Sequence, residues 1–357
     1  MKIAHVITTI DRGGAEKQLF TLCREQKKLG HSITIFPLKG NLELAAEFNR
    51  IKVDVDLVFF QKNFIKQVLY FKRKLIEDFD IYHAHLPQAE ILTTFGIQKN
   101  HLLVITRHFA GKFAPKLPKF LSSFLSRIAT YKASKVIAIS NSVREVLILN
   151  KEVLHPEKIE VVYYGYDRKY KNSKVRVRKN KKNLSVGTIA RLSPEKDLTT
   201  LISAISNLKN ENYFCSLKIV GDGPLKSQLF KIVHSSNLEN NIEFLGKIAD
   251  PYPFLKSLDV FVLASKFEGF GLSLLEAMDS GTKIVVSKNS ALEEIVGDSS
   301  AAIYFKTSDA LDLSQKIKYA NRISVKKFNK DQKTILEKFT SKKMICAIEK
   351  IYINLVN

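Results

Sequence analysis

The chain has 357 residues, of which 45% are hydrophobic and 26% charged, a balance typical of a folded protein with room for two domains rather than of a disordered one. The formal net charge of +22 indicates an anionic partner (nucleic acid, anionic lipid or a phosphorylated substrate) unless it reflects only a lysine-rich surface. No apolar run reaches the roughly 18 residues of a transmembrane helix, and the apolar start is too short for a secretory signal, so a cytoplasmic protein is expected.

In the first half of the chain, short apolar runs alternate with longer amphipathic segments, which is typical of βαβ units in a parallel sheet. A helix is predicted over 15–29, where Leu19, Leu22 and Leu29 fall mainly on one face. Residues 1–167 are therefore expected to form a Rossmann-like α/β domain. Its expected strands are 3–8, 32–37, 81–84, 102–106, 135–139 and 159–162.

Residues 168–182 contain nine lysines or arginines and no acidic residue. Such a self-repelling segment is expected to be a solvated linker between domains. The alternative is a basic patch that contacts lipid or another polyanion.

The α/β pattern restarts after this linker and predicts a second Rossmann-like domain over 183–325. Its strands are expected at 184–187, 217–220, 242–245, 260–263 and 284–287, and its helices at 198–208, 225–235, 271–280 and 291–296. The last segment, 326–357, is predicted to be helical with one apolar face and to pack back toward the N-terminal domain.

Two doubly wound domains in series are expected to place the carboxyl ends of both sheets at one cleft, where ligands bind in such folds. Directly after the first predicted strand, Gly13 and Gly14 precede a helix. Paired glycines let the backbone approach a ligand, and the helix N-terminus offers N–H groups to an anion. A tight turn is the alternative explanation of this pair.

The second half carries two further loops of this kind. Arg191 and Lys196 stand between a predicted strand and helix, where two cations can clamp a diphosphate; the alternative is a pair of ordinary surface charges. Gly221 and Gly223 form a Gly-Asp-Gly-Pro turn after the next strand. These glycines are either structural or admit a nucleotide base against the backbone.

Two glutamates eight residues apart follow the strand at 260–263. Glu268 lies in the loop after the strand, placed to contact a transferred sugar, and Glu276 lies about two turns into the next helix, where it could accept two ribose hydroxyls. Between them, the backbone of Phe270, Gly271 and Leu272 is suited to phosphate contact.

This ordered set, R-x4-K, the glycine turn and E-x7-E, resembles the donor-site signature of the retaining glycosyltransferases of family 4 (glycosyl transferases group 1). The resemblance covers essentially the whole chain and implies the GT-B fold, in which two Rossmann-like domains face each other across a cleft. It assigns acceptor binding to the N-terminal domain and the nucleotide-sugar donor to the C-terminal domain. It also implies that Gly13 and Gly14 lie beside the donor diphosphate and that His108, in the segment VITRHFAG, lies beside the reacting sugar.

The resemblance implies metal-independent chemistry, with Arg191, Lys196 and backbone N–H groups stabilising the departing diphosphate in place of a metal. No cofactor is expected besides the nucleotide-sugar co-substrate, with UDP as the first choice and GDP as the second. His83 and His85 are candidate acceptor contacts; their spacing could suggest a metal, but no third ligand is evident. The cysteines lack metal-ligand spacing, and each is predicted to be a small core residue: Cys23, Cys215 and Cys346.

The chain departs from the family pattern at two places. Lys288 and the pair Ser290-Ala291 stand where the family usually has Asp and a Gly-Gly pair, which makes the preferred donor sugar and base harder to infer. Asp279 and Ser280 replace a commoner small apolar pair, and the sequence indicates no consequence of this exchange.

The segment 109–135 contains lysines and arginines among aromatic residues, and Phe120 and Phe124 recur at helical spacing. This predicts either a helix that lies on an anionic membrane or one packed on its own sheet. Because relatives commonly build surface glycans, the expected acceptor is lipid-linked or polysaccharide, in lipopolysaccharide, capsule or exopolysaccharide synthesis, and the expected location is cytoplasmic with peripheral attachment to the inner face of the membrane.

Other functions remain open at this stage. A nucleic-acid binder would explain the charge but not the ordered loops, and no nucleic-acid module is recognisable. A GT-B phosphorylase or an epimerase would share the architecture. A non-catalytic sugar-nucleotide-binding subunit would keep the diphosphate clamp but would not need His108 and Glu268.

Overall fold

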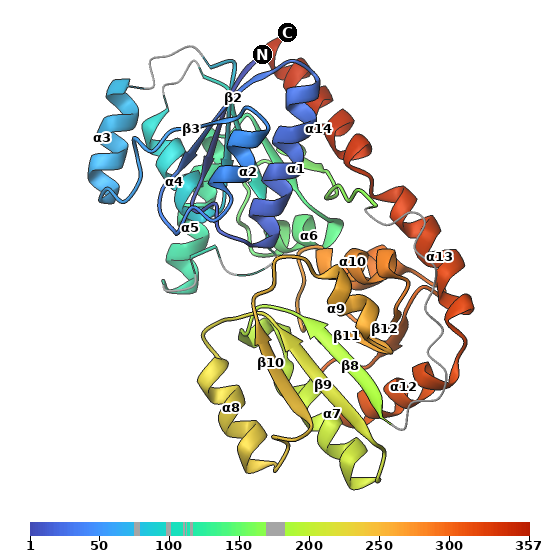
Figure 1. Ribbon diagram of the computed structural model, residues 1–357. Helices are drawn as coiled ribbons and strands as arrows, with labels where there is room; N and C mark the ends of the chain where they lie inside the picture. The colour runs from blue at the N-terminus through green and yellow to red at the C-terminus, as the bar shows by residue number, and fades with distance from the viewer. Residues whose placement is uncertain (75–78, 98–100, 110, 112, 115–116, 169–182) are drawn as a thin grey trace. The chain divides into compact units, whose positions relative to one another are not determined.

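The computed structural model describes residues 1–74, 79–97, 101–109, 111, 113–114, 117–168 and 183–357. The chain forms two compact units: unit 1 comprises Met1–Gly165 and Phe339–Asn357, and unit 2 comprises Tyr166–Lys338 (Figure 1). Within the described residues, no helix is long and apolar enough to cross a membrane. Most of the predicted linker, 169–182, lies outside the described residues.

Unit 1 is built on a seven-stranded parallel sheet with the order β3-β2-β1-β4-β5-β6-β7. The order reverses between β1 and β4, which is the switch point where doubly wound folds bind ligands. All six predicted strands are present, with ends within one residue of the prediction. Strand β3 was not predicted, because two residues are too few to show a pattern of apolar and polar residues. The strands are β1 (Lys2–Ile7), β2 (Ser32–Pro37), β3 (Asp54–Val55), β4 (Ile81–His85), β5 (Leu103–Arg107), β6 (Lys135–Ala138) and β7 (Ile159–Val161).

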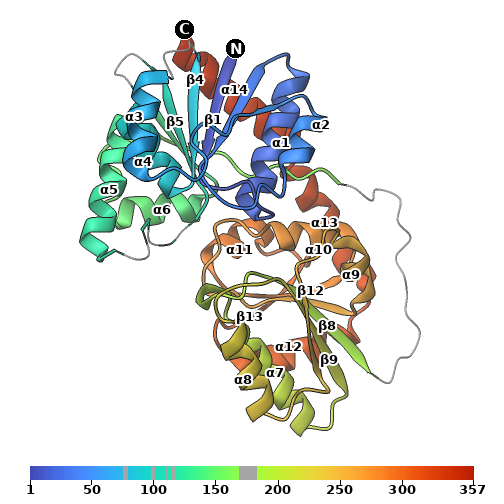
Figure 2. The ribbon, with the colours of Figure 1, turned by 60° about the vertical axis from the view of Figure 1, so that its left-hand side comes forward.

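Helices cover both faces of this sheet, so its strands are buried on both sides (Figure 2). On one face α1 packs against α14, and on the other α4 lies over β1, β4 and β5 with α3 and α5 beside it. The helices are α1 (Gly14–Lys28), α2 (Ala45–Arg50), α3 (Phe64–Lys74), α4 (Pro87–Gly96), α5 (Lys119–Lys132), α6 (Asn141–Leu149) and α14 (Ser341–Val356), with a 3-10 turn η1 (Pro156–Lys158).

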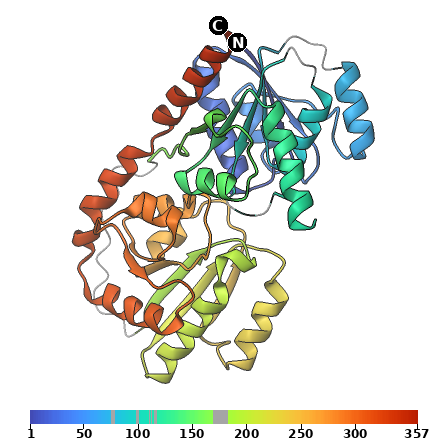
Figure 3. The same cartoon turned by 180° about the vertical axis from the view of Figure 1, so that it is seen from behind.

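Unit 2 contains a six-stranded parallel sheet with the order β10-β9-β8-β11-β12-β13. On one face α7 and α12 pack together over the sheet, and α10 contacts β12, α9 and α13 (Figure 3). The five predicted strands are confirmed, and the short β13 was missed. The strands are β8 (Leu184–Ile189), β9 (Cys215–Val220), β10 (Ile242–Gly246), β11 (Val260–Leu263), β12 (Lys283–Ser287) and β13 (Ile303–Phe305). The helices are η2 (Pro194–Lys196), α7 (Leu198–Asn210), α8 (Lys226–Ser235), α9 (Tyr252–Ser257), α10 (Leu272–Ser280), α11 (Ser290–Val296), α12 (Ala310–Arg322) and α13 (Val325–Lys338).

The C-terminal segment 326–357, predicted as one helical element, is divided between the units. The helix breaks at Phe339, whose ring is buried against Tyr163, and restarts after Thr340, whose hydroxyl caps α14 by accepting from the Lys343 amide. Helix α13 therefore belongs to unit 2 and α14 to unit 1. The apolar face predicted for α14 is confirmed, since Met344 packs on the core of unit 1.

One cysteine prediction is wrong. Cys23 and Cys215 are buried as expected, but Cys346 is exposed because it lies on the face of α14 opposite its apolar stripe.

Asp279 has a structural role that the sequence did not reveal. Its side chain is fully buried near the end of α10, where it accepts hydrogen bonds from the Tyr166 hydroxyl at 3.1 Å and from Arg168 Nε at 3.2 Å. A small apolar residue here would remove the acceptor of both hydrogen bonds. The exchange therefore ties the first residues of unit 2 to α10.

Candidate active site

The glycine turn after β9 supports the loop that carries Arg191. A Cβ on Gly221 would lie 1.9 Å from the Ala190 carbonyl oxygen, and Gly221 has a φ of +135°. A Cβ on Gly223 would lie 2.5 Å from the Leu192 carbonyl oxygen. The two segments are also joined by a hydrogen bond of 3.1 Å from the Leu192 amide to the carbonyl of the intervening aspartate. Both glycines are thus required by the protein's own packing, and they present Arg191 at the surface.

Lys196 and Glu268, which are 72 residues apart, are brought together in unit 2. Lys196 Nζ donates to Glu268 Oε1 at 2.7 Å, and the Ser265 hydroxyl donates to the same oxygen at 2.7 Å. Glu268 is only 8% exposed, whereas the Lys196 side chain is 19% exposed. The carboxylate expected to contact a sugar is therefore held by the lysine expected to contact the diphosphate.

Helix α10 begins directly after this carboxylate. Gly271 precedes it with a φ of +99°, a conformation that favours glycine, and the Phe270 ring is buried beneath the loop. The half-buried Leu272 opens the helix, whose N-terminus is suited to an anion. Glu276 lies four residues on, about 6 Å further along the axis, and is half-buried with a partner in the protein.

The loops that follow β11 and β12 are joined to each other. The Ser287 hydroxyl donates to the Ser265 carbonyl at 2.6 Å, and Asn289 Nδ2 donates to the same carbonyl at 2.9 Å. Asn289 Oδ1 also caps α11 by accepting from the Leu292 amide. Lys288, the departure noted in the sequence, stands exposed between them. The loop that holds Glu268 is thereby fixed by side chains of the neighbouring loop.

In unit 1, the glycine pair connects β1 to α1. Gly14 is exposed as the first residue of the helix, and Gly13 precedes it in an extended conformation. The Glu16 carboxylate folds back over this turn, so that a Cβ on Gly13 would lie 2.3 Å from Glu16 Oε2. The Thr9 hydroxyl holds Glu16 Oε1 at 2.7 Å. A side chain already occupies part of the space beside this helix N-terminus.

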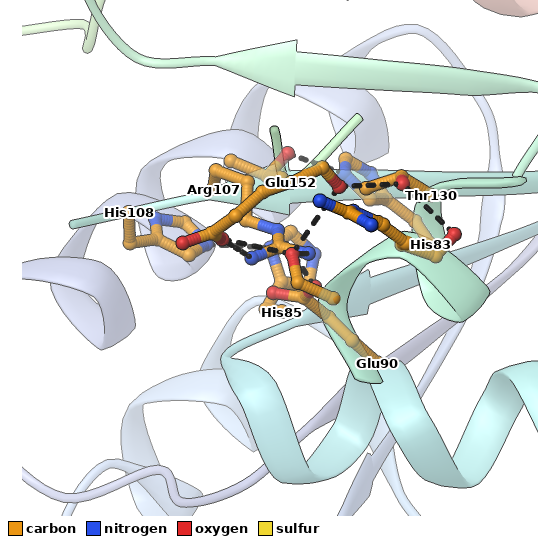
Figure 4. Close-up of polar contacts among 10 residues, drawn as sticks. His83, His85, Glu90, Arg107, His108, Thr130 and Glu152 are labelled. Atoms are coloured by element: carbon orange, nitrogen blue, oxygen red, sulfur yellow. Dashed lines mark hydrogen bonds and ion pairs between the residues drawn. The ribbon is translucent and has the colours of Figure 1, made fainter. Parts of the chain in front are cut away.

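His108 follows β5 and belongs to a chain of hydrogen bonds between side chains (Figure 4). Its Nε2 is 3.0 Å from His85 Nδ1, and its Nδ1 is 2.5 Å from the Tyr164 hydroxyl. Further in, His85 Nε2 is 3.0 Å from His5 Nδ1, and His5 Nε2 is 2.9 Å from Gln26 Oε1. His5, Gln26 and Tyr164 were not singled out from the sequence. The available signal was a histidine within the otherwise apolar first strand.

The two histidines proposed as acceptor contacts lie inside unit 1. His83 is fully buried, and its ring nitrogens are 2.5 Å from the Tyr352 hydroxyl and 2.6 Å from the Thr106 hydroxyl. His85 is 2% exposed and bonded on both sides. Neither offers a nitrogen to an acceptor, so these two assignments have no structural support.

The buried histidines are neutral at neutral pH. Burial lowers the pKa of His108 to about 3 and that of His5 to about 4. It also holds the pKa values of His83 and His85 well below their ordinary range. The cause is the cost of charging a ring in a poorly solvated environment.

A buried ionic cluster anchors the residue before His108 (Figure 4). Arg107 Nε is 2.8 Å from a Glu90 oxygen and its Nη1 is 3.4 Å from a Glu152 oxygen, while its other terminal nitrogen donates to Ser126. Burial raises the pKa of Glu90 to about 7, although Arg107 opposes the shift. The cluster was not predicted, because its members are separated widely in the sequence.

Comparisons with known proteins agree with this architecture. Residues 12–170 match the family described as Glycosyltransferase Family 4, and residues 169–335 match Glycosyl transferases group 1. The structure of Anabaena HepE in complex with UDP-glucose superposes with a TM-score of 0.82 at 21% identity, over 99% of this chain and 100% of that one. The chain belongs to the GT-B glycosyltransferases.

Two relatives of this glycosyltransferase have names that state the pathway or the acceptor they serve. The O-antigen biosynthesis glycosyltransferase WclY of Escherichia coli is 22% identical over 99% of each chain. A Campylobacter jejuni enzyme named as an N-acetylgalactosaminyltransferase acting on a diphospho-undecaprenol-linked sugar is 27% identical over 56% of this chain and 53% of its own length. The GT-B fold predicted from the sequence is confirmed.

Proposed function

We propose that the protein transfers a hexose-type sugar from a UDP-sugar, with a GDP-sugar as the second choice, to a lipid-linked or polysaccharide acceptor in cell-surface glycan synthesis. The reaction retains the anomeric configuration and uses no metal. The observation that carries this proposal is the pairing of Lys196 with Glu268 beside the start of α10, because it joins a cation, a carboxylate and a helix N-terminus in one loop cluster. The names of the relatives support the acceptor class.

The leaving group determines what the cations do. When the bond between the anomeric carbon and the phosphate oxygen breaks, its electron pair stays on the diphosphate. Lys196, Arg191 and the amides at the start of α10 stabilise that charge, as preorganised donors do in a site of low dielectric. An ammonium group has three N–H donors, so Lys196 can hold the diphosphate while it still donates to Glu268.

The acceptor hydroxyl forms the new bond to the anomeric carbon on the side the diphosphate leaves, and its proton passes to the departing phosphate oxygen. Glu268 then orients the sugar rather than acting as a base. His108 is neutral at physiological pH, so its contribution is a hydrogen bond of defined direction rather than a charge.

Peripheral attachment to an anionic membrane is part of the proposal. On α5, Phe120 is 77% exposed and Phe124 is 55% exposed, with Lys119 exposed beside them. Phe113, an aromatic residue of the same segment 109–135, is instead buried against the Arg107 guanidinium. Exposed aromatic rings flanked by cations suit the interface of an anionic bilayer.

Thermal unfolding with a panel of UDP-, GDP- and ADP-sugars in EDTA tests the donor site. We expect UDP-sugars to raise the unfolding temperature of the wild type and of Lys218→Ala, which removes an exposed lysine from β9 of the same unit. Lys196→Ala should lose the shift. Anomeric proton couplings of the product then report retention. No shift with any nucleotide sugar, alongside binding to nucleic acid, would overturn the proposal.

A further inference from the structure

The buried side chains behind His108 form a continuous hydrogen-bonded chain across the sheet of unit 1. Its members come from α1, β1, β4, the end of β5 and the segment after β7, and the order is Gln26, His5, His85, His108 and Tyr164. His5 and His83 are aligned in the parallel register of β1 and β4, which brings the rings to one face of the sheet. The proposed function gives no role to His5 or Gln26.

The three histidine rings that lie between two members of this chain must all donate their hydrogen bonds in the same direction along it. A neutral imidazole has one N–H donor and one acceptor nitrogen, so a ring bonded on both sides donates in one direction only. Gln26 Oε1 accepts at one end, which places the proton of His5 on Nε2. The same reasoning then places the protons of His85 and His108 on Nε2, and Tyr164 donates to His108 Nδ1.

We propose that His5, His85 and Gln26 are positioning residues that fix His108 as the Nε2–H tautomer, which leaves Nδ1 as an acceptor for a hydroxyl group. In the free protein that hydroxyl belongs to Tyr164, and during sugar transfer a donor-sugar hydroxyl takes its place. This inference rests on the proposed function for its substrate, but the tautomer itself does not depend on it.

Two other uses of these histidines fit less well. Ring nitrogens of His5, His83 and His85 lie within 4.8 Å of one another, as metal ligands would. However, both nitrogens of each ring already have protein partners. A proton relay would also need an inner end that can accept a proton, and the chain ends on the Gln26 amide.

The environment favours a single arrangement. His5, His85 and Gln26 are buried, and the small pocket beside the chain is lined largely by apolar side chains such as Leu22, Ile137 and Ile348. In these surroundings, reversing one bond requires reversing all of them, and an unmatched ring nitrogen would be costly.

Substitutions at His5 distinguish the effect of the hydrogen-bonded chain from the effect of core packing. Asn places Oδ1 close to the position of the histidine Nδ1, so His5→Asn keeps the acceptor for His85, whereas His5→Leu removes it. Thr106→Val is the matched control, because it removes a buried hydrogen bond from the neighbouring His83 without interrupting the chain.

The tautomers can be read from long-range proton–nitrogen NMR correlations of protein labelled at its eight histidines. We expect Nε2–H at His5, His85 and His108 in the wild type and in Thr106→Val. His5→Leu should shift His108 toward Nδ1–H and lower kcat about 10-fold with the donor KM within about 2-fold, as substitutions behind a functional histidine do. His5→Asn should restore both within about 3-fold.

Several outcomes would overturn the inference. They are a mixture of tautomers at His108 in the wild type, a stoichiometric metal ion retained by the purified protein, or equal losses in His5→Leu and Thr106→Val that follow stability alone. If the wild type transfers no sugar, the proposed function fails while the NMR result still decides the tautomer. If it transfers sugar and His5→Leu does so equally well, only the inference fails.

Discussion

The two units hold their candidate functional side chains in opposite environments. In unit 1, His108 is bonded to buried residues on both sides, and the neighbouring Arg107 lies between two buried carboxylates. In unit 2, Lys196 and Arg191 stand on loops at least partly open to solvent, and their placement depends on backbone turns and short side-chain contacts.

This difference determines what a substitution should change. A buried polar group that loses its partner keeps the full cost of its lost hydration, so variants in unit 1 should first affect stability. A group on an exposed loop can exchange its partner for water, so variants in unit 2 should first affect ligand binding and rate. Five predictions test this contrast.

The largest effect is expected at the buried cation of unit 1. Arg107→Met leaves Glu90 and Glu152 buried without their partner and should lower the free energy of unfolding by about 3–5 kcal/mol, measured by urea titration. The control is Arg12→Met, which breaks a partly exposed pair with Glu47 and should cost under about 1 kcal/mol. Equal losses would remove the contrast between buried and exposed pairs.

The lysine of unit 2 should show the reverse behaviour. Lys196→Ala is expected to lower kcat by about 100- to 1000-fold, because it removes a donor to the leaving diphosphate. It should cost less stability than Arg107→Met, because the Ser265 hydroxyl still donates to Glu268 Oε1. Steady-state kinetics in EDTA beside urea titration separates the two effects. The control is Lys218→Ala, whose activity should equal that of the wild type. A stability loss at Lys196 as large as that at Arg107 would contradict the comparison.

The glycine turn tests how unit 2 positions its loop. Gly221→Ala introduces a Cβ against the Ala190 carbonyl at a strained φ and should cost about 1–3 kcal/mol while weakening nucleotide-sugar binding. Gly246 also has a positive φ, but nothing lies near its Cβ, so Gly246→Ala measures the strain of φ alone. Calorimetric titration of both variants should show weakened binding only for Gly221→Ala.

Lowering the pH should reduce the stability of unit 1 before that of unit 2. The buried histidines have folded pKa values below their ordinary 6.5, so the unfolded chain binds more protons and stability is lost as pH falls below about 6.5. Each such group contributes about 1.4 kcal/mol per pH unit within its window. Glu90, with a raised folded pKa of about 7, opposes this trend, since its stability contribution falls as pH rises from about 4.5 to 7.

Hydrogen exchange at pH 7 and pH 5 can measure this difference separately in the two units. After correction for the slower intrinsic exchange at pH 5, we expect lower protection factors at pH 5 in β1, β4 and β5, and a larger loss in Glu90→Gln, which removes the opposing contribution. An equal loss of protection in both units would show that the histidines do not govern the acid response.

The smallest effect is expected on the surface of α5. Phe120→Ser should weaken binding to vesicles that contain anionic lipid by a few-fold to about 10-fold, because one exposed ring leaves the interface. Phe214→Ser removes a similarly exposed ring from unit 2 and serves as the control. Sedimentation with vesicles at two salt concentrations checks both variants; equal binding of Phe120→Ser and Phe214→Ser would argue against α5 as the contact.

Much of this protein could be read from local sequence. The alternation of apolar runs predicted the strands of both sheets, because a buried parallel strand is almost continuously apolar. Gly221 and Gly271 stand at turns after strands and have positive φ values that favour glycine, and Gly13 stands at such a turn where a Cβ would meet the Glu16 carboxylate. Lys196 and Glu268 could also be proposed from the sequence, since loops after strands are where a doubly wound fold exposes polar groups.

The tertiary structure decided which polar groups meet. Asp279 lies near the end of a helix and receives its partners from residues more than a hundred positions away. In the same manner, the buried cluster around Arg107 joins helices α4 and α5, strand β5 and the segment after α6. His83 and His85 were proposed as acceptor contacts, yet packing of α1 and α14 encloses them. The sequence determines which residues prefer burial and which turns are allowed, but a hydrogen bond depends on direction and distance, and these exist only once distant strands are aligned in one sheet.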